Sequence, residues 1–438
     1  MKRLFLVLLS LGLVMVFSTS VFAADVKFSG SFYAAGMYQD ETVFIKDTTG
    51  YPSTAFYYQR LRVKMEFVAT PALKLVTRFD AMERIWGGAR TQPGGITSLI
   101  GDLDSAASRD ENENIAFDWA YIEYASPFGV FMVGYQEDMA WGTKFADWSR
   151  PAGKIAWAYT IGGFTVMADI AKILELSSNA VIGTVPWSDG DIDKYSVAGK
   201  YTWNQGEAGL KVAYLRSAAL RSIGPEATTN LYGVIPYVKA KFGPVQVEAE
   251  VDYYWGDLLD EDDGPNKIKL ESLGVYVDAL ADLGMFYVGG TVAYLSGDGD
   301  ITDDTLKLMA GGKDWQPMLI LFNYDRTYWA GIIDAPIPDF GIMYNAWFGQ
   351  IRAGVRPVAD LELGVSLSYA RADKKLFPGM DKDYGTELDV TATYKITNNL
   401  SYMLGVGYLW TGKYWREDYT DLDVTDNYLV INKLTLTF

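Results

Sequence analysis

The sequence contains neither cysteine nor histidine among its 438 residues. Without cysteine it can have no disulfide scaffold and no attachment site for a c-type haem. Without histidine it lacks the side chain best suited to proton transfer near neutral pH. Paired carboxylates could still do acid–base chemistry, but a hydrated row of charges explains them more simply. We therefore predict that the chain is not an enzyme and needs no cofactor.

Basic residues are also scarce, with 38 Lys and Arg against 55 Asp and Glu. Nucleic-acid binding needs a basic surface, so we expect no nucleic-acid partner. Aromatic residues are abundant, at 15% of the chain with 30 Tyr and 13 Trp. Such rings suit the two edges of a bilayer, although a soluble sandwich core would use them equally well. Composition alone therefore does not decide the fold.

Long apolar runs are absent except at the start, from Leu4 to Phe17. Two basic residues precede this run, and Val21-Phe22-Ala23 follows it, which is the pattern of a secretory signal peptide. We predict a signal peptide over residues 1–23, cleaved between Ala23 and Ala24. No later segment approaches the roughly 20 apolar residues of a membrane helix. A membrane β-strand needs only about ten residues, of which alternate ones are apolar.

Strict alternation of apolar and charged residues is the strongest pattern in the chain. Within 60–69, Arg60, Arg62, Lys64 and Glu66 alternate with apolar neighbours such as Leu61. The same period of two recurs over 73–82, 245–255 and 387–396. Alternation of this kind predicts strands with one face on lipid and the other on a wet interior. We expect one all-β domain over residues 24–438, a transmembrane antiparallel β-barrel.

Short turns alternate with long polar loops between the strand-like segments. We predict eight short turns, at 70–71, 126–129, 162–163, 204–206, 243–244, 281–283, 357–360 and 397–399. They give about 18 strands, with 16 as the alternative count, short periplasmic turns, long extracellular loops and both termini in the periplasm. The longest loop, 296–340, is rich in aromatic residues. We expect it to fold into the lumen or cap the mouth; an extra hairpin or packing against a neighbouring molecule are the alternatives.

The last strand of the pattern ends in an aromatic residue, with Tyr428, Leu436 and Phe438 on one face. It resembles the closing strand of Gram-negative outer-membrane proteins, which the barrel-assembly machinery recognises. The whole pattern resembles outer-membrane porins, in size those of about eighteen strands, and segments 313–322 and 344–347 are similar to alginate-export-like channels. The resemblance implies a bacterial outer-membrane location, contact with outer-membrane lipid and lipopolysaccharide, a homotrimer, and passive diffusion of small polar or charged solutes.

Charged residues on the inward face are the candidate pore-lining residues. The basic candidates are Arg60, Arg62, Lys64, Lys74, Arg78, Arg352 and Arg356. The acidic candidates are Glu66, Asp80, Glu248, Glu250, Asp252, Glu387 and Asp389. They could form salt bridges that brace the wall, or opposed basic and acidic sides that set ion preference.

The hairpin around Thr70 predicts which of these charges lie opposite each other. A pivot near Thr70 places Arg62 opposite Arg78, Arg60 opposite Asp80, and Glu66 opposite Lys74. Like charges directly opposite each other are destabilising. An Arg62–Arg78 pair would therefore need water, an acid from another strand or a passing anion.

Other functions fit parts of the pattern. One alternative is a substrate-specific channel for saccharides or organic anions. Another is a barrel sheath around a periplasmic partner, such as a multihaem cytochrome. Two acidic segments, 260–264 and 298–304, could offer oxygen ligands to divalent ions, although neither has the spacing of an EF-hand loop and solvated loops explain them equally.

Overall fold

The computed structural model describes residues 25–46, 53–87, 115–176, 190–222, 226–300 and 302–438. The predicted signal peptide, with its cleavage site at Ala23 and Ala24, lies outside the described residues. The strands are β1 (Asp25–Gln39), β2 (Thr54–Thr70), β3 (Leu73–Ile85), β4 (Ile115–Ser126), β5 (Gly129–Asp138), β6 (Arg150–Ile161), β7 (Phe164–Leu174), β8 (Ile192–Trp203), β9 (Gly206–Ser217), β10 (Ala227–Phe242), β11 (Val245–Glu261), β12 (Lys267–Asp282), β13 (Phe286–Leu295), β14 (Thr305–Leu306), β15 (Ala346–Val358), β16 (Leu361–Ala372), β17 (Asp383–Lys395), β18 (Leu400–Thr411) and β19 (Asn427–Thr437).

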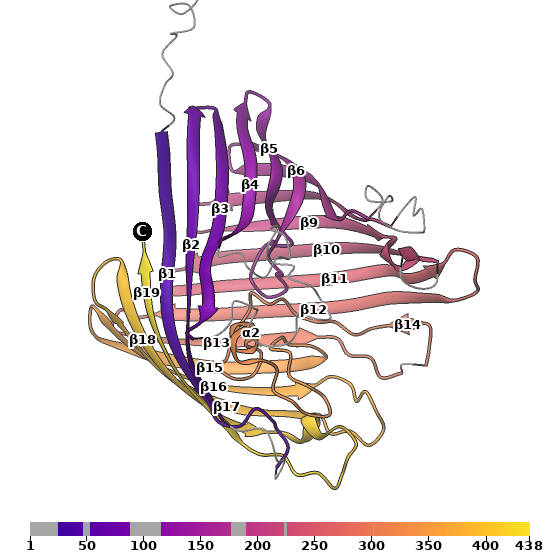
Figure 1. Cartoon of the computed structure of the whole chain (residues 1–438), viewed down its shortest axis with the longest axis vertical. Helices are drawn as coiled ribbons and strands as arrows, with labels where there is room; N and C mark the ends of the chain where they lie inside the picture. The colour runs from indigo at the N-terminus through magenta and orange to yellow at the C-terminus, as the bar shows by residue number, and fades with distance from the viewer. Residues whose placement is uncertain (1–24, 47–52, 88–114, 177–189, 223–225, 301) are drawn as a thin grey trace, which may run out of the picture.

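Eighteen long strands, each antiparallel to its neighbours, form one closed sheet (Figure 1). The sheet closes because β19 pairs with β1 over nine residues, from Ser31 opposite Thr437 to Gln39 opposite Leu429. β14 is a two-residue addition that runs parallel to β12. The predicted barrel and its strand number are confirmed, and each of the eight predicted short turns joins two neighbouring strands. No helix in the described ranges is both long and apolar enough to span a bilayer.

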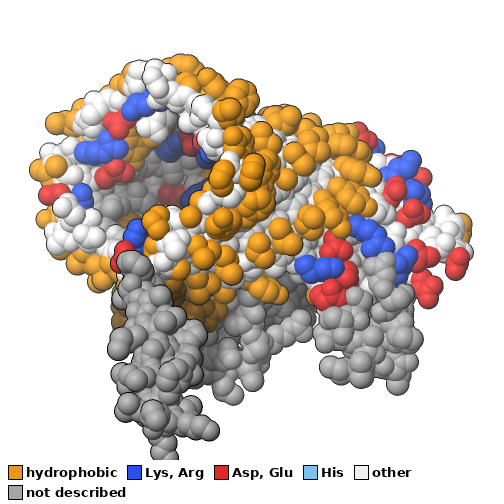
Figure 2. All heavy atoms as spheres, turned by 90° about the horizontal axis from the view of Figure 1, so that it is seen from above, with side chains coloured by type: hydrophobic (Ala, Val, Ile, Leu, Met, Phe, Trp, Pro, Cys, Tyr) orange, Lys and Arg blue, Asp and Glu red, His pale blue; other side chains and the backbone are white. Residues whose placement is uncertain are grey.

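The apolar face of the strands points outward. Phe28 of β1 is 62% exposed and pairs with Met65, while Leu75 of β3 is 41% exposed and pairs with Phe67. Directly paired residues share one face of a sheet, so the apolar residues of β2 lie on the outer surface with them. Figure 2 shows hydrophobic side chains covering the outer wall and charged side chains within the hollow. This inversion of a soluble core is expected of a wall that faces lipid.

Aromatic side chains gather in rows on the outer wall. Tyr195, Tyr214, Tyr232 and Trp255 lie directly opposite one another on β8 to β11, with successive ring centroids 6.1, 5.0 and 5.8 Å apart. At the end of the barrel that carries the short turns, Phe164 of β7 lies directly opposite Tyr201 of β8, and their ring centroids are 4.8 Å apart. Amphipathic rings at two heights suit the two interfaces of a bilayer.

Both ends of the described chain lie at the short-turn end of the barrel. Asp25 at the start of β1 pairs with Val68, two residues before the end of β2. The Thr437 N–H donates to the Asn399 carbonyl in the turn before β18, at 2.8 Å. The long loops therefore all leave from the opposite end.

The segment between β13 and β15 folds into the barrel instead of extending from it. Ile320, Leu321 and Phe322 are fully buried, and Trp329 of helix α2 (Tyr324–Ala330) stacks on Tyr58 of β2 with ring centroids 4.5 Å apart. The predicted folding of this loop into the lumen is confirmed, because its aromatic residues supply the core of an internal plug. A short 3-10 helix, η3 (Lys413–Arg416), adds Trp415 to the same core.

A buried ion pair holds this internal segment together. Arg326 donates to Asp339 at 2.8 Å, and the two side chains are 1% and 0% exposed. The same guanidinium also donates to the Ile320 carbonyl at 3.0 Å and to Gln39 of β1 at 3.3 Å. A buried charge is tolerated when its hydrogen bonds are satisfied, so Arg326 fixes the segment both to itself and to the wall.

Candidate functional site

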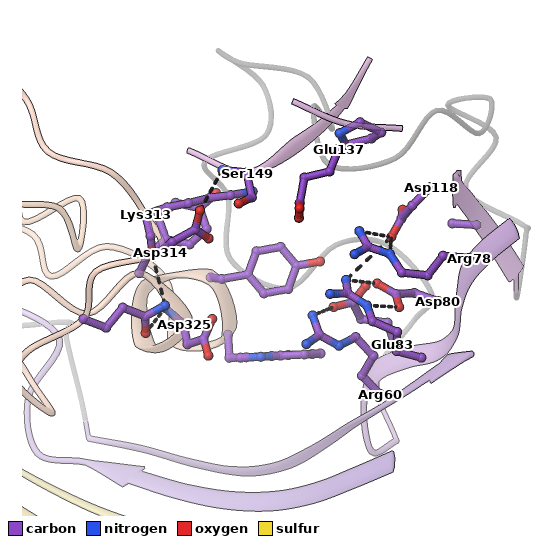
Figure 3. Close-up of a pocket in the computed structure, with 17 residues that line it drawn as sticks. Arg60, Arg78, Asp80, Glu83, Asp118, Glu137, Ser149, Lys313, Asp314 and Asp325 are labelled. Carbon is purple, nitrogen blue, oxygen red and sulfur yellow. Dashed lines mark hydrogen bonds and ion pairs between the residues drawn. The ribbon is translucent and has the colours of Figure 1, made fainter. Parts of the chain in front are cut away.

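Arginines of β2 and β3 form one side of a charged cavity inside the barrel (Figure 3). Arg62 makes a two-point ion pair with Asp80, with Nε–Oδ1 and Nη2–Oδ2 distances of 2.7 and 2.6 Å. Arg78 donates twice to Asp118 Oδ2, at 3.2 and 3.1 Å. Paired arginines of this kind are held in fixed positions, because a guanidinium matches a carboxylate geometrically.

The third arginine is held more loosely. Arg60 Nη1 lies 3.4 Å from Glu83 Oε1, and its guanidinium carbon lies 5.2 Å from the centre of the Tyr33 ring. Arg78 adds a closer contact of the same type, with 3.7 Å to the Trp119 ring. Such cation–π contacts support the arginines without neutralising them.

The predicted register of the β2–β3 hairpin is wrong. Arg62 lies opposite Asp80, and Lys64 lies opposite Arg78, so the expected Arg62–Arg78 and Arg60–Asp80 pairs do not form. The turn pivots later than expected, because β2 runs to Thr70 and β3 begins only at Leu73, with a register shift beside the turn. Arg62 therefore meets an acid directly.

Two predicted residues beside the turn meet diagonally instead of directly. Glu66 lies opposite Val76 and Lys74 lies opposite Val68, but Lys74 Nζ still reaches Glu66 Oε2 at 3.4 Å. Lys64 joins them at 2.8 Å from Glu66 Oε1. These three charges form a cluster at the short-turn end, outside the charged cavity.

The other side of the charged cavity is formed by the folded-in segment. Lys313, Asp314 and Asp325 face the arginines across a space of about 270 Å³ (Figure 3). Asp314 is fixed by the Ser149 N–H, which donates to its Oδ2 at 2.7 Å. The Asp325 N–H donates to Gln316 Oε1 at 3.2 Å, which closes the first turn of α2 onto the preceding loop. Charges from two distant parts of the chain thus meet across one space.

Acidic groups exceed basic ones around this cavity. Four basic side chains line it, namely Arg60, Arg62, Arg78 and Lys313, against six acidic ones, namely Asp80, Glu83, Asp118, Glu137, Asp314 and Asp325. Three of these acids, Asp80, Glu83 and Asp118, form ion pairs with the arginines. The segment opposite brings two further carboxylates and one ammonium, so the lining as a whole favours positive charge.

The predicted basic residues of β15 lie elsewhere on the inner wall. Arg352 makes a two-point pair with Asp278, at 2.7 and 2.8 Å. Arg356, near the short-turn end, donates to Glu362 at 2.9 Å and to Asp282 at 3.1 Å. Both reach across β13 to an acid of β12, Arg356 also bonds to the adjacent β16, and neither lines the charged cavity.

Four of the predicted acids lie beneath folded loops. Glu250, Asp252, Glu387 and Asp389 are 2%, 1%, 1% and 4% exposed, although each is on the inward face. Glu248 is less buried and lies opposite Lys239 and Asp278 of the adjacent strands. The charges that face the arginines therefore come from the loop 313–325 and not from β11 and β17, because alternation predicts a face but not which loop covers it.

In the loop between β5 and β6, Asp147 has a pKa well above that of an ordinary aspartate. Burial raises the pKa of the Asp147 carboxyl to about 8, with nearby Glu250 and Asp314 adding to the effect. The Trp141 N–H, which donates to Asp147 Oδ1 at 2.6 Å, opposes the rise. Asp147 thus titrates near neutral pH, where an ordinary aspartate is fully ionised.

Several residues of the site have no distinctive sequence signal. Asp118, Glu83 and Asp325 were not among the candidates, although Asp118 stands alone between Phe117 and Trp119 in an aromatic strand. An isolated charge among apolar residues is the one signal that marks Asp118 as inward-facing. In the part of the chain that the structure describes, no group of three or more acidic side chains is arranged to hold a metal ion.

Taken together, the geometry defines a large closed barrel whose lipid-facing wall encloses a polar, loop-narrowed interior. No protein-family model matches the chain, and no curated protein matches it. Among solved structures, a BenF-like porin from Pseudomonas fluorescens Pf-5 is similar, with a TM-score of 0.51, 11% sequence identity and coverage of 94% of this chain and 99% of that one. Pseudomonas aeruginosa OccK2 (OpdF), solved with glucuronate, gives a TM-score of 0.50 at 11% identity, covering 96% and 99%. OpdK from the same organism, solved with vanillate, gives 0.50 at 11%, covering 94% and 99%. The chain has the fold of the outer-membrane porins.

Proposed function

We propose that this chain is an integral channel of the bacterial outer membrane that lets small polar solutes diffuse passively, cations more readily than anions. The charged cavity between β2–β3 and the folded-in loop is the observation that carries the proposal. Its lining is fixed by ion pairs and carries more acid than base. Rings of charge at a constriction set the ion preference of a pore.

Because basic and acidic side chains lie on opposite sides of the cavity, the electric field inside it has a direction as well as a net sign. Arg60, Arg62 and Arg78 lie on the wall, while Asp314 and Asp325 lie on the loop across from it. A dipolar solute would be oriented between the two sides as it passes. Passive diffusion needs no cofactor or energy source, and we retain the prediction that the chain is not an enzyme.

Two alternatives are less well supported. A channel specific for organic anions would need unpaired basic groups in the charged cavity, but Arg62 and Arg78 there are each paired with a carboxylate. Glucuronate and vanillate are ligands of the similar proteins OccK2 and OpdK and carry no assignment for this chain. A sheath around a multihaem cytochrome would need an open bore, whereas the segment between β13 and β15 folds into this one and buries its core there.

The orientation and partners of the channel belong to the same proposal. We place the short-turn end, with both termini, in the periplasm, and the long loops outside the cell. Tyr428, Leu436 and Phe438 on the closing strand would bind the barrel-assembly machinery, and the mature chain would begin at Ala24. Contact with lipopolysaccharide and assembly into a homotrimer stay predictions.

Conductance in planar bilayers tests the proposal. Purified residues 24–438 should give steady, ohmic current steps in KCl, with the same slope at positive and negative voltage. Heat-denatured protein from the same preparation serves as the control. Absence of any conductance from folded, inserted barrels at all voltages would contradict the proposed function.

A further inference from the structure

A second cavity lies inside the barrel against β9, β10 and β11, which run side by side in Figure 1. Its volume is about 240 Å³, equivalent to about eight water molecules. Most of its lining is apolar, with Leu215, Leu231 and Ile235 on the wall and Met139 on the covering loop. An apolar space with a few polar groups is the usual form of a small-molecule site.

Two charged groups in this cavity lack partners for all or part of their bonding capacity. Lys211 is 8% exposed and, within the described ranges, has no hydrogen bond or ion pair; its ammonium lies 5.9 Å from the Trp141 ring. Asp252 is 1% exposed, and its Oδ2 has no hydrogen-bond partner in the same part of the chain. Its other oxygen accepts a long bond from Tyr254, at 3.5 Å, and its carboxyl group also interacts with the Glu250 side chain two residues earlier on β11.

Buried charges without partners are costly, so they suggest a missing ligand. The neighbouring Lys194 does not explain them, because its ammonium is already bonded to Asp138 and lies 3.5 Å from Asp169. Asp147, which also lines the cavity, has its Oδ1 engaged by the Trp141 N–H. Among the described residues, the Lys211 ammonium, Asp252 Oδ2 and the second oxygen of Asp147 thus remain without a hydrogen bond in one mostly apolar space.

Glycines in the wall make room for the two aromatic rings of the site. A Cβ at Gly209 would lie 2.8 Å from the Trp141 ring, and one at Gly233 would lie 2.8 Å from the Tyr254 ring. The Trp141 indole is pinned by a 3.0 Å bond from Nε1 to the Ile235 carbonyl. This bond is available because the β10–β11 pairing is interrupted at Ile235 and the following proline, which has no N–H. The rings are thus held in place before any ligand arrives.

We propose that this cavity is a binding site for a zwitterionic α-amino acid with an aromatic side chain. The ligand carboxylate would pair with Lys211, the ligand ammonium with Asp252, and its ring would lie among Leu215, Leu231 and the Trp141 and Tyr254 rings. A ligand with only one charge would leave the other protein group buried and unpaired. This proposal identifies aromatic amino acids as one class of solute for the channel, and it therefore rests on the proposed function.

Calorimetry of the folded barrel in detergent tests the site with three matched probes. They are L-phenylalanine, 3-phenylpropionate, which lacks the ammonium, and 2-phenylethylamine, which lacks the carboxylate. Phenylalanine should bind at least about tenfold more tightly than either analogue, because each analogue leaves one charge unpaired. Equal binding of the three probes, or no binding of phenylalanine, would overturn the site, and this comparison needs no variant.

Variants assign the two charges. Lys211→Met should abolish the advantage of phenylalanine over 2-phenylethylamine, and Asp252→Asn its advantage over 3-phenylpropionate. Glu248→Gln, on the same strand as Asp252 but outside the cavity, should change neither. Loss of phenylalanine binding in Glu248→Gln as large as in the other two would overturn the assignment. Binding requires no conduction, so a conducting barrel that ignores phenylalanine overturns the site alone, and a binding barrel that does not conduct overturns the channel alone.

Discussion

The Glu387 carboxylate of β17 accepts the backbone N–H of Leu321 at 2.9 Å, and its second oxygen accepts the Ile320 N–H at 2.7 Å. One strand residue thus supplies both acceptors for a turn of the folded-in segment. Loop amides buried away from water need such partners, since an unsatisfied group costs about 1–3 kcal/mol. Glu387 therefore anchors the loop that narrows the barrel.

Replacement of this anchor should loosen the loop. Glu387→Ala leaves two buried N–H groups without acceptors, so we expect about 1–3 kcal/mol less local stability. Hydrogen exchange at Ile320 and Leu321 should become about five- to a hundredfold faster, and channel current should become noisier. Glu248→Ala removes an inward acid with no bond to this loop and serves as the control. Unchanged exchange in Glu387→Ala would show that the loop is held by its apolar contacts alone.

The buried Arg326–Asp339 pair should matter more than any exposed pair in the same region. Asp339→Ala leaves the guanidinium buried and uncompensated, which typically costs about 3–5 kcal/mol. Limited proteolysis of the segment 323–345 should become much faster, while the strands stay protected. Asp303→Ala removes the exposed pair with Lys307 (3.8 Å apart) and should change little, because exposed pairs contribute about 0–1 kcal/mol. Equal proteolysis of the two variants would contradict the role of the buried pair.

Docking of the loop between β5 and β6 should depend on pH through Asp147. Its pKa is raised to about 8 in the folded chain, from an ordinary value near 4, so the folded state holds a proton that the unfolded state has lost between these values. The contribution of this group therefore favours the docked loop more at pH 6 than at pH 9. Exchange of the amides at 141–147 should therefore become faster as pH rises from about 4 to about 8 and should level off above that, after correction for the intrinsic rate.

Asp147→Asn should remove this pH dependence, since the amide resembles the protonated acid and does not titrate. Asp303→Asn, on an exposed loop, should leave the wild-type profile intact. A pH profile that persists in Asp147→Asn would assign the effect to another group.

The outward apolar face predicts a strong difference between neighbouring positions of one strand. Val390, in the middle of β17, is 51% exposed, and the adjacent Thr391 points the other way. Val390→Arg should destabilise the barrel in lipid vesicles by about 2–4 kcal/mol, because it places a charge in hydrocarbon. Thr391→Arg should cost much less, since its side chain faces the wet interior. Urea titration of folding into vesicles measures both, and the reverse order would contradict the assignment of faces.

Much of this architecture follows from the sequence, because period-two alternation and short turns are local signals. Arg60 and Leu61 could be assigned to opposite faces from their spacing alone, and the eight turns gave the strand number. Register was harder: the Arg62–Asp80 pair forms because the turn pivots one residue later than Thr70, and no local signal marks that position. The contacts of the folded-in loop could not be predicted from the sequence at all, since nothing local indicates that Asp314 and Asp325 face Arg60 across the barrel. Glu387 looked like a pore-lining charge for the same reason, although the loop covers it.

The reversal potential in a KCl gradient tests the central claim most directly. A cation-preferring pore should give a potential of the sign set by K⁺ moving down its gradient. Asp314→Asn combined with Asp325→Asn should move the potential towards zero, and Arg60→Gln should move it further in the cation direction. A potential of the opposite sign in the unmodified chain, or one that these variants leave unchanged, would contradict the assignment of the charged cavity as the selective constriction.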